Sequence, residues 1–155
     1  MRRAAFITVL IIILAGALPA AATGTLGCAA NDEAAQVDVH GIVPYSSAAP
    51  LLQVQAEIKA SLPGIAADLG SMTFGSEHNS QYWLDATSLN LLFYRERAVA
   101  GPFGSTTLVI KTTRNDSDEE GAYAGTYAIE GYEVPASGGE AIIVHVKGVI
   151  ECFAG

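Results

Sequence analysis

The residues of this chain that could do chemistry include a run of carboxylates, Asp116-Ser-Asp-Glu-Glu-Gly121. Asp116, Asp118 and Glu120 stand at alternate positions before a glycine, as in the first half of an EF-hand calcium loop. The twelfth position of such a loop is Tyr127, where calcium needs a bidentate Glu. We therefore expect a solvated hairpin tip whose charges discourage edge pairing, with these carboxylates as a weak calcium site at most.

The three histidines, His40, His78 and His145, have none of the short spacings that are typical of zinc sites. His78 lies in the one cluster that combines an acid, a histidine and hydroxyl groups, residues 76–80. Neighbours in sequence rarely form a catalytic triad, and no G-x-S-x-G motif accompanies them. The sequence thus predicts no metal centre and no cofactor. A hydrolase would need His78 or His145 to converge with a distant carboxylate and a nucleophile.

Two cysteines, Cys28 and Cys152, lie near the two ends of the chain. An exported protein meets an oxidising environment, so an even pair predicts one disulfide that ties the ends together. Closing a loop of about 120 residues stabilises a fold by roughly 4 to 5 kcal/mol in chain-entropy models. A metal pair or a reactive thiol is disfavoured, because no C-x-x-C spacing is present.

Aromatic residues gather in segments that have the composition of strands: Tyr82, Trp83, Phe93, Tyr94, Tyr123, Tyr127 and Tyr132. On a strand, successive side chains point to opposite faces, so some of these rings must enter the core. If Trp83, Tyr82, Tyr94 and Tyr127 shared an outward face, they would form a patch that stacks carbohydrate or docks a protein.

The N-terminus has the pattern of a secretory signal peptide. Arg2 and Arg3 precede an apolar stretch, residues 4–18, and small residues in an A-x-A pattern follow. About 15 apolar residues fall short of the roughly 20 that span a bilayer. We expect residues 1–22 to be removed and residues 23–155 to be secreted or periplasmic, without a membrane span. Thr-Leu-Gly before Cys28 loosely resembles a lipobox, so a lipid anchor on Cys28 is the alternative.

The composition is acidic, with 16 Asp and Glu against 8 Lys and Arg and a formal net charge of −8. Removal of Arg2 and Arg3 would make the charge more negative. Such a balance disfavours nucleic acid and anionic membranes as partners. We find no internal repeat and no linker, so a single domain is expected, and a chain of this size buries enough surface to fold without a metal ion.

The elements that must position these residues have mostly the period of two that is typical of strands. Apolar and β-branched residues predict strands at 36–43, around Met72 and Phe74, and at 82–87, 89–97, 105–113, 122–132 and 140–153. The last is the longest apolar run after the leader and the best candidate for a central strand. Together these segments predict an all-β fold, an antiparallel sandwich or small barrel of about seven or eight strands.

Residues 52–62 allow two interpretations. Apolar and polar residues alternate without a fault, which indicates a strand. Leu51, Val54, Ile58 and Leu62 also have helical spacing between two prolines, which indicates a helix. We favour the strand, with one helical turn within residues 65–69.

The absence of a catalytic motif favours a non-enzymatic role. The leading hypothesis is an exported β-domain that acts by binding, or as a surface component, with a protein, a glycan or a small apolar ligand as its partner. The alternatives are a barrel that carries a small apolar ligand, lined by Leu91, Phe93, Val109 and Ile143, and a hydrolase whose site is not visible in the sequence.

Overall fold

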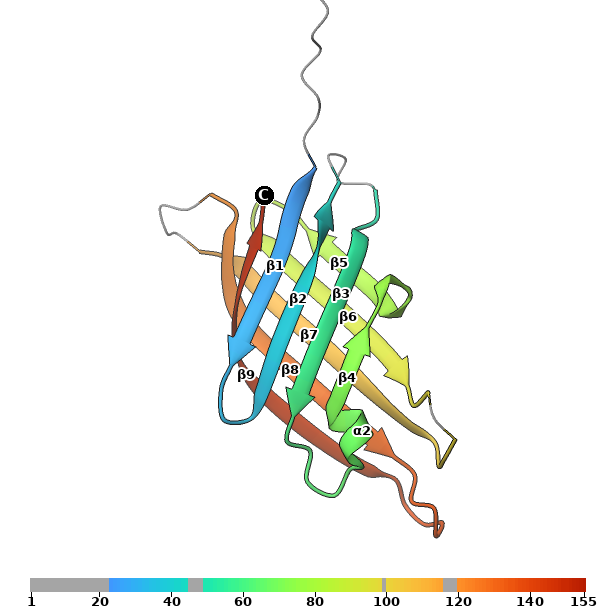
Figure 1. Ribbon diagram of the computed structural model, residues 1–155. Helices are drawn as coiled ribbons and strands as arrows, with labels where there is room; N and C mark the ends of the chain where they lie inside the picture. Colours follow the sequence, from blue (N-terminus) through green and yellow to red (C-terminus); the bar gives the residue numbers. More distant parts are fainter. Residues whose placement is uncertain (1–22, 45–48, 99, 116–119) are drawn as a thin grey trace, which may run out of the picture.

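The computed structural model describes residues 23–44, 49–98, 100–115 and 120–155. These residues form nine strands, one short α-helix and one 3-10 turn (Figure 1). The elements are β1 (Gly24–Asn31), β2 (Ala35–Val43), β3 (Leu52–Ala60), α2 (Ala67–Gly70), β4 (Ser71–Phe74), η2 (Ser76–His78), β5 (Asn79–Leu84), β6 (Ser88–Glu96), β7 (Gly104–Arg114), β8 (Ala122–Glu133) and β9 (Ile142–Ala154). The predicted all-β fold is confirmed. No helix in the described ranges is long and apolar enough to cross a membrane.

The nine strands form one antiparallel sheet in the order β4-β3-β2-β1-β9-β8-β7-β6-β5. Each strand pairs with its neighbour in the chain, except that β4 does not pair with β5, and the first strand pairs with the last. The fold is therefore an up-and-down barrel that lacks one seam. In Figure 1, β1 to β4 form a front layer whose strands cross those of β5 to β8 behind.

Alternation along the strands sets the two faces of the sheet. In β3, Val54, Ala56 and Ile58 are buried, and the residues between them are exposed. The strand interpretation of this segment is therefore correct, and the expected helical turn follows as α2. A helix here would have turned the intervening polar residues onto the same face as the apolar ones.

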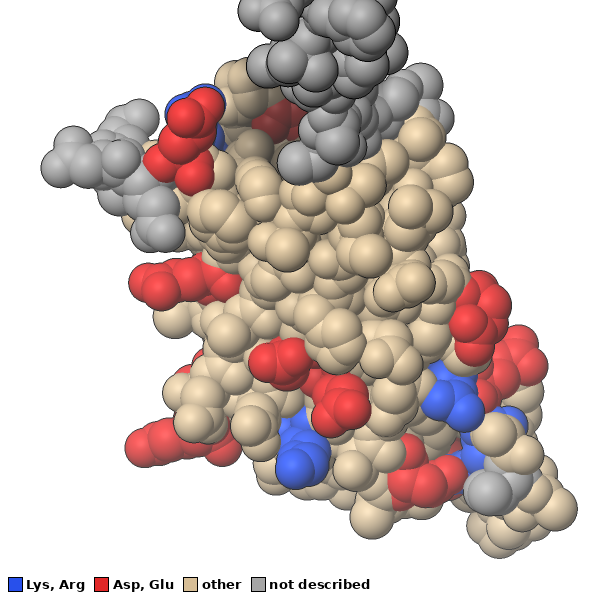
Figure 2. Space-filling model, turned by 45° about the horizontal axis from the view of Figure 1, so that its top comes forward, with Lys and Arg blue, Asp and Glu red and all other residues tan. Residues whose placement is uncertain are grey.

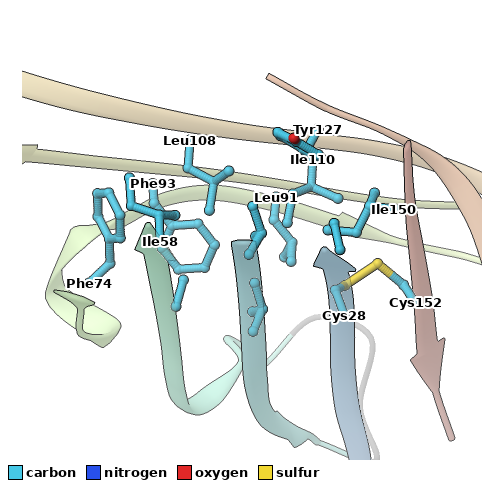
Figure 3. Packing of buried hydrophobic residues seen from close by; sticks show 14 of the residues in the cluster. Cys28, Ile58, Phe74, Leu91, Phe93, Leu108, Ile110, Tyr127, Ile150 and Cys152 are labelled. Atoms are coloured by element: carbon cyan, nitrogen blue, oxygen red, sulfur yellow. A yellow bond between two sulfur atoms is a disulfide. The ribbon is translucent and has the colours of Figure 1, made fainter. Parts of the chain in front are cut away.

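The core fills the inside of the curved sheet (Figure 3). Its largest side chains include Tyr127, Phe74, Phe93, Leu108 and Ile110, none of which is more than 1% exposed. The rings of Phe74 and Phe93 lie 5.7 Å apart between centroids and join β4 to β6. Each such side chain contributes about 1.5 to 3 kcal/mol of burial, so this cluster is the main source of stability.

The predicted disulfide is present. Cys28 of β1 lies opposite Cys152 of β9 with their Cα atoms 4.0 Å apart, and both side chains are buried in the core. β1 was not predicted as a strand, because its Gly and Ala residues have low strand propensity. Pairing with β2 on one side, and with β9 through the disulfide on the other, holds it in the sheet.

A buried arginine fixes the connection between β3 and β4. Arg97, whose side chain is 7% exposed, donates to Asp68 at 2.8 Å, to the Pro102 carbonyl at 2.7 Å and to Glu133. Glu133 also accepts the backbone N–H of Ala66 at 2.8 Å. These bonds hold the segment before α2 against β8. Hydrogen bonds from Arg97 lower the pKa of both carboxyl groups.

Candidate binding face

Trp83, the only tryptophan of the chain, lies on β5 and points away from the core. Its side chain is 62% exposed, an unusual position for the largest apolar side chain. The indole Nε1–H donates to Asp85 Oδ2 at 2.8 Å. This bond fixes the edge of the ring.

Backbone and hydroxyl groups of the turn between β5 and β6 hold the Asp85 carboxylate in place. Asp85 Oδ1 accepts the backbone N–H groups of Thr87 and Ser88, each at 2.7 Å, and the Thr87 hydroxyl at 2.8 Å. Hydrogen bonds from Trp83 and then from Thr87 hold the pKa of Asp85 far below its usual range. The Tyr123 hydroxyl, from β8, donates to the Asp85 carbonyl at 2.9 Å. The indole is thus fixed before any ligand arrives.

A groove of about 360 Å³ lies beside Trp83 on the outer face of β5, β6 and β7. The pairing brings together residues from three strands: Trp83 lies opposite Asn90 and Asn90 opposite Lys111, while Gln81 lies opposite Leu92 and Leu92 opposite Val109. Leu92 and Val109 are half-buried and form an apolar floor. The amides of Gln81 and Asn90 and the amine of Lys111 form a polar rim. Such a site can hold a ring against the indole and bond its hydroxyl groups at the rim.

The four aromatic residues considered as a possible binding face do not share one face of the sheet. Trp83 and Tyr94, which is 38% exposed, point outward. Tyr82 donates its hydroxyl to the Ala49 carbonyl, in the segment before β3. Tyr127 is buried inside the sheet, where burial and then the hydrogen bond to Asp32 raise its pKa.

The candidate calcium ligands fall at the β7–β8 connection. Asp116 and Asp118 lie outside the described residues, and Glu120 is exposed. Within the described ranges, no three His, Cys, Asp or Glu side chains are grouped so that they could hold a metal ion.

The structure does not bring the histidines together. His78 lies in η2, where its Nδ1 accepts the Gly75 N–H at 2.9 Å. His145 is exposed on β9, 3.5 Å from Glu130. His40 lies on β2, where its Nε2 and Gln55 Oε1 are 2.9 Å apart. None of these contacts is made with a hydroxyl group that could serve as a nucleophile.

A second groove, of about 620 Å³, lies over the outer face of β1. Its floor includes Gly27, which no described heavy atom approaches closely. Its sides carry Asp38 and His40 from β2, and Glu151 and Phe153 from β9. Carboxylates on both sides give this groove an acidic character. Figure 2 shows that Asp and Glu outnumber Lys and Arg on the face that it displays.

The four residues expected to line an internal cavity do not share one face of the sheet. Leu91 and Phe93 point inward and are buried in the core, whereas Val109 and Ile143 point outward. The inner face is occupied by the core side chains, and both large grooves described above lie outside.

Sequence reasoning found Trp83 but not the residues around it. Gln81, Asn90 and Lys111 meet only through the register of three strands, which the composition of each strand does not reveal. One local signal was available: Asp85 followed by Thr87 and Ser88 is typical of a turn closed by an Asp side chain. Comparisons with protein-family models, with curated proteins and with solved structures find no match for this chain.

Proposed function

We propose that this chain is an exported, non-catalytic binding domain that binds carbohydrate on the face around Trp83. The observation that carries the proposal is the fixed, exposed indole beside an apolar floor with an amide rim. A pyranose ring presents C–H groups on its faces and hydroxyl groups at its edge, which matches an aromatic platform with polar groups around it. The ring faces of Trp83 are ready for such stacking without reorganisation, which lowers the entropic cost of binding.

Export rests on the leader-like N-terminus together with the disulfide between Cys28 and Cys152. Mass spectrometry of the mature protein tests it. We expect an N-terminus near Thr23, and no acyl group on Cys28, because Cys28 is consumed by the disulfide. A chain that keeps residues 1–22, or that carries lipid on Cys28, contradicts this part of the proposal.

The fluorescence of the single tryptophan tests the binding site directly. Soluble oligosaccharides of β-linked glucose, of N-acetylglucosamine and of mannose are titrated into the protein, and at least one class should change the emission of Trp83. In an affinity measurement by calorimetry, Trp83→Ala should weaken that binding at least about tenfold, or about 1.4 kcal/mol. Trp83→Phe, which keeps a ring for stacking, should lose less.

Phe103→Ala is the matched control, because Phe103 is an exposed aromatic outside the groove, packed against Tyr132. It should leave saccharide affinity unchanged. The proposal fails if no oligosaccharide of the panel binds, or if binding is the same in Trp83→Ala and wild type. Binding lost equally in the Phe103 control would indicate a general loss of fold.

A further inference from the structure

Most of β9 has a neighbouring strand on one side only. β9 pairs with β8 along its whole length, from Ile142 opposite Glu133 to Phe153 opposite Ala122. On its other side β1 pairs only with residues 151–154. Among the described residues no strand pairs with residues 142–150 on that side. This open edge, residues 142–150, follows the lower left border of the molecule in Figure 1.

The register shows which backbone groups point to the open edge. Thr25 and Gly155 exchange both of their hydrogen bonds, so the backbone of Gly155 points to β1, whereas Ala154 donates to Gly121 on the β8 side. The β8–β9 register has no shift, so this alternation continues along the strand. The N–H and C=O groups of Ile143, His145, Lys147 and Val149 therefore point away from β8. The described structure gives them no hydrogen-bond partner.

The side chains of the same residues lie on the outer face. Ile143 is 53% exposed and Val149 is 75% exposed, and the charged or polar His145 and Lys147 lie between them. Natural edge strands are usually short, bulged or heavily charged, which prevents pairing with another chain. This edge is regular, carries exposed apolar residues at both ends and has a single lysine.

We propose that two copies of this chain associate through the open edges of their β9 strands, antiparallel and about a two-fold axis at Val146. In this register, Ile143 pairs with Val149 of the second copy and His145 pairs with its Lys147. All four residues of each copy then exchange hydrogen bonds, and the two most exposed apolar side chains of the strand lie opposite each other. The interface is the same surface on both copies, as a two-fold dimer requires.

The neighbouring registers fit less well. A shift of two residues toward the C-terminus puts Lys147 opposite a second Lys147 and Ile143 opposite Glu151, whose backbone already pairs with Ala29. A shift in the other direction leaves Val149 opposite residue 141, which lies before β9 begins. The Val146 register alone uses every free group of residues 143–149 on both copies.

Lys147→Pro tests the backbone pairing. Proline removes the N–H that points to the open edge and leaves the bonds between β9 and β8 intact, and edge strands tolerate proline at such positions. By analytical ultracentrifugation at about 100 µM, the wild type should be a dimer and Lys147→Pro a monomer. Lys147→Ala is the matched control, since it removes the charge but keeps the N–H, and it should remain dimeric. Thermal unfolding monitored at low concentration, where all variants are monomeric, checks that Lys147→Pro folds.

Charge exchange tests the register without touching the backbone. The double variant Ile143→Lys/Val149→Lys places lysine opposite lysine in its own dimer, and Ile143→Glu/Val149→Glu places carboxylate opposite carboxylate, so each alone should be monomeric. Mixed in equal amounts, they should form a heterodimer, which native mass spectrometry separates from either homodimer by mass. Trp83→Ala, on the far edge of the sheet, should not change the association.

Three results would overturn the proposal: a wild type that stays monomeric at about 100 µM, a dimer that survives Lys147→Pro, or charged variants that do not associate when mixed. The second would place the dimer interface elsewhere on the molecule, and the third would reject the Val146 register.

Discussion

The sheet is interrupted in two places, and the chain treats the two differently. Around the gap between β4 and β5, the Arg95 guanidinium of β6 donates to the Thr73 carbonyl of β4, and the Ser76 hydroxyl of η2 donates to the Val54 carbonyl of β3 at 3.1 Å. The rings of Phe74, from β4, and Phe93, from β6, also pack against each other. At the open edge of β9, no described side chain makes a hydrogen bond to the outward backbone groups of residues 143, 145, 147 and 149.

The difference follows from where each edge points. β4 and β5 face each other within one chain, so side chains and the short turn η2 can fill the space between them. The edge of β9 has no strand beside it within the described residues, so water or another chain must supply hydrogen bonds to its outward backbone groups. A gap that side chains fill adds to the stability of the monomer, whereas an outward edge is available for association.

The largest effect should come from the Cys28–Cys152 disulfide, which lies near the end of the open edge. Replacing both cysteines, in Cys28→Ala/Cys152→Ala, removes the covalent link between β1 and β9 and should cost about 4 kcal/mol of unfolding free energy. Urea denaturation measures it. A loss below about 1 kcal/mol would mean that the β1–β9 pairing holds without the disulfide. If the open edge then extends toward Cys152, the double variant should also aggregate more readily.

The next largest effect should come from Arg97, which binds Asp68 of α2 and Glu133 of β8. Arg97→Ala leaves Glu133, which is mostly buried, without its cation and should destabilise the protein by about 3 kcal/mol. Arg114→Ala, an exposed arginine on β7, is the control and should change the stability by less than about 0.5 kcal/mol. Equal effects of the two substitutions in urea denaturation would contradict a buried ion network.

A smaller effect should come from Gly148, on the part of β9 that β1 does not pair with. The Tyr127 ring passes over Gly148 to donate its hydroxyl to Asp32 at 2.8 Å, and a Cβ at residue 148 would overlap both groups. Gly148→Ala should therefore cost about 2 kcal/mol. Gly27→Ala is the matched control, because open space surrounds that position. It should be neutral or slightly stabilising, since alanine restricts the unfolded chain.

Acid should weaken the ion network before it unfolds the core. Hydrogen bonds from Arg97 lower the pKa of Asp68 from 3.8 and of Glu133 from 4.5 in the folded state. Such groups bind protons more readily when the chain unfolds, so their stabilisation is present above about pH 4.5 and is lost as the pH falls through the lowered values. We expect the unfolding free energy to be flat from pH 7 to about 5 and then to fall. The fall should be shallower in Arg97→Ala, and an equal slope would contradict this assignment.

The period of two along the sequence predicted the strands well, but it did not predict what covers the faces of each strand. The alternation of residues 52–60 identified β3, because one buried face leaves a clear record in the sequence. β9 was expected to be a central strand, and it is fifth of nine in the sheet. Its continuous apolar run suggests burial on both faces, yet Ile143 and Val149 are exposed in the monomer. An apolar run cannot distinguish a strand covered by its own chain from one that another copy covers.

The candidate binding face was predictable only at its centre. Trp83 was singled out because of its residue type. Its companions come from three strands, and a shift of one residue in the register would turn Asn90 and Lys111 into the core. Tyr127 shows the converse: its type suggested a binding face, but its position in the alternation placed it inside.

The last measurement needs no mutation. It compares the backbone amides of β9 that point to β8 with those that point to the open edge. In dilute solution, where the chain is monomeric, the amides of Val146, Gly148 and Ile150 should exchange slowly with deuterium, because they donate to β8. Those of Lys147 and Val149 should exchange quickly, because they point to the open edge. The two sets alternate along one strand, so they share the same local environment and differ only in their partners.

Raising the protein concentration then tests whether two β9 edges pair. If two β9 edges pair, the Lys147 and Val149 amides should become protected as the dimer forms, while Val146, Gly148 and Ile150 change little. The amides of Tyr82 and Trp83, on the strand that borders the β4–β5 gap, should show no dependence on concentration, because that edge faces its own chain. Protection of Lys147 and Val149 that is the same at every concentration would mean that the edge of β9 is already covered within one molecule. It would then be a second gap of the kind between β4 and β5, closed by its own chain.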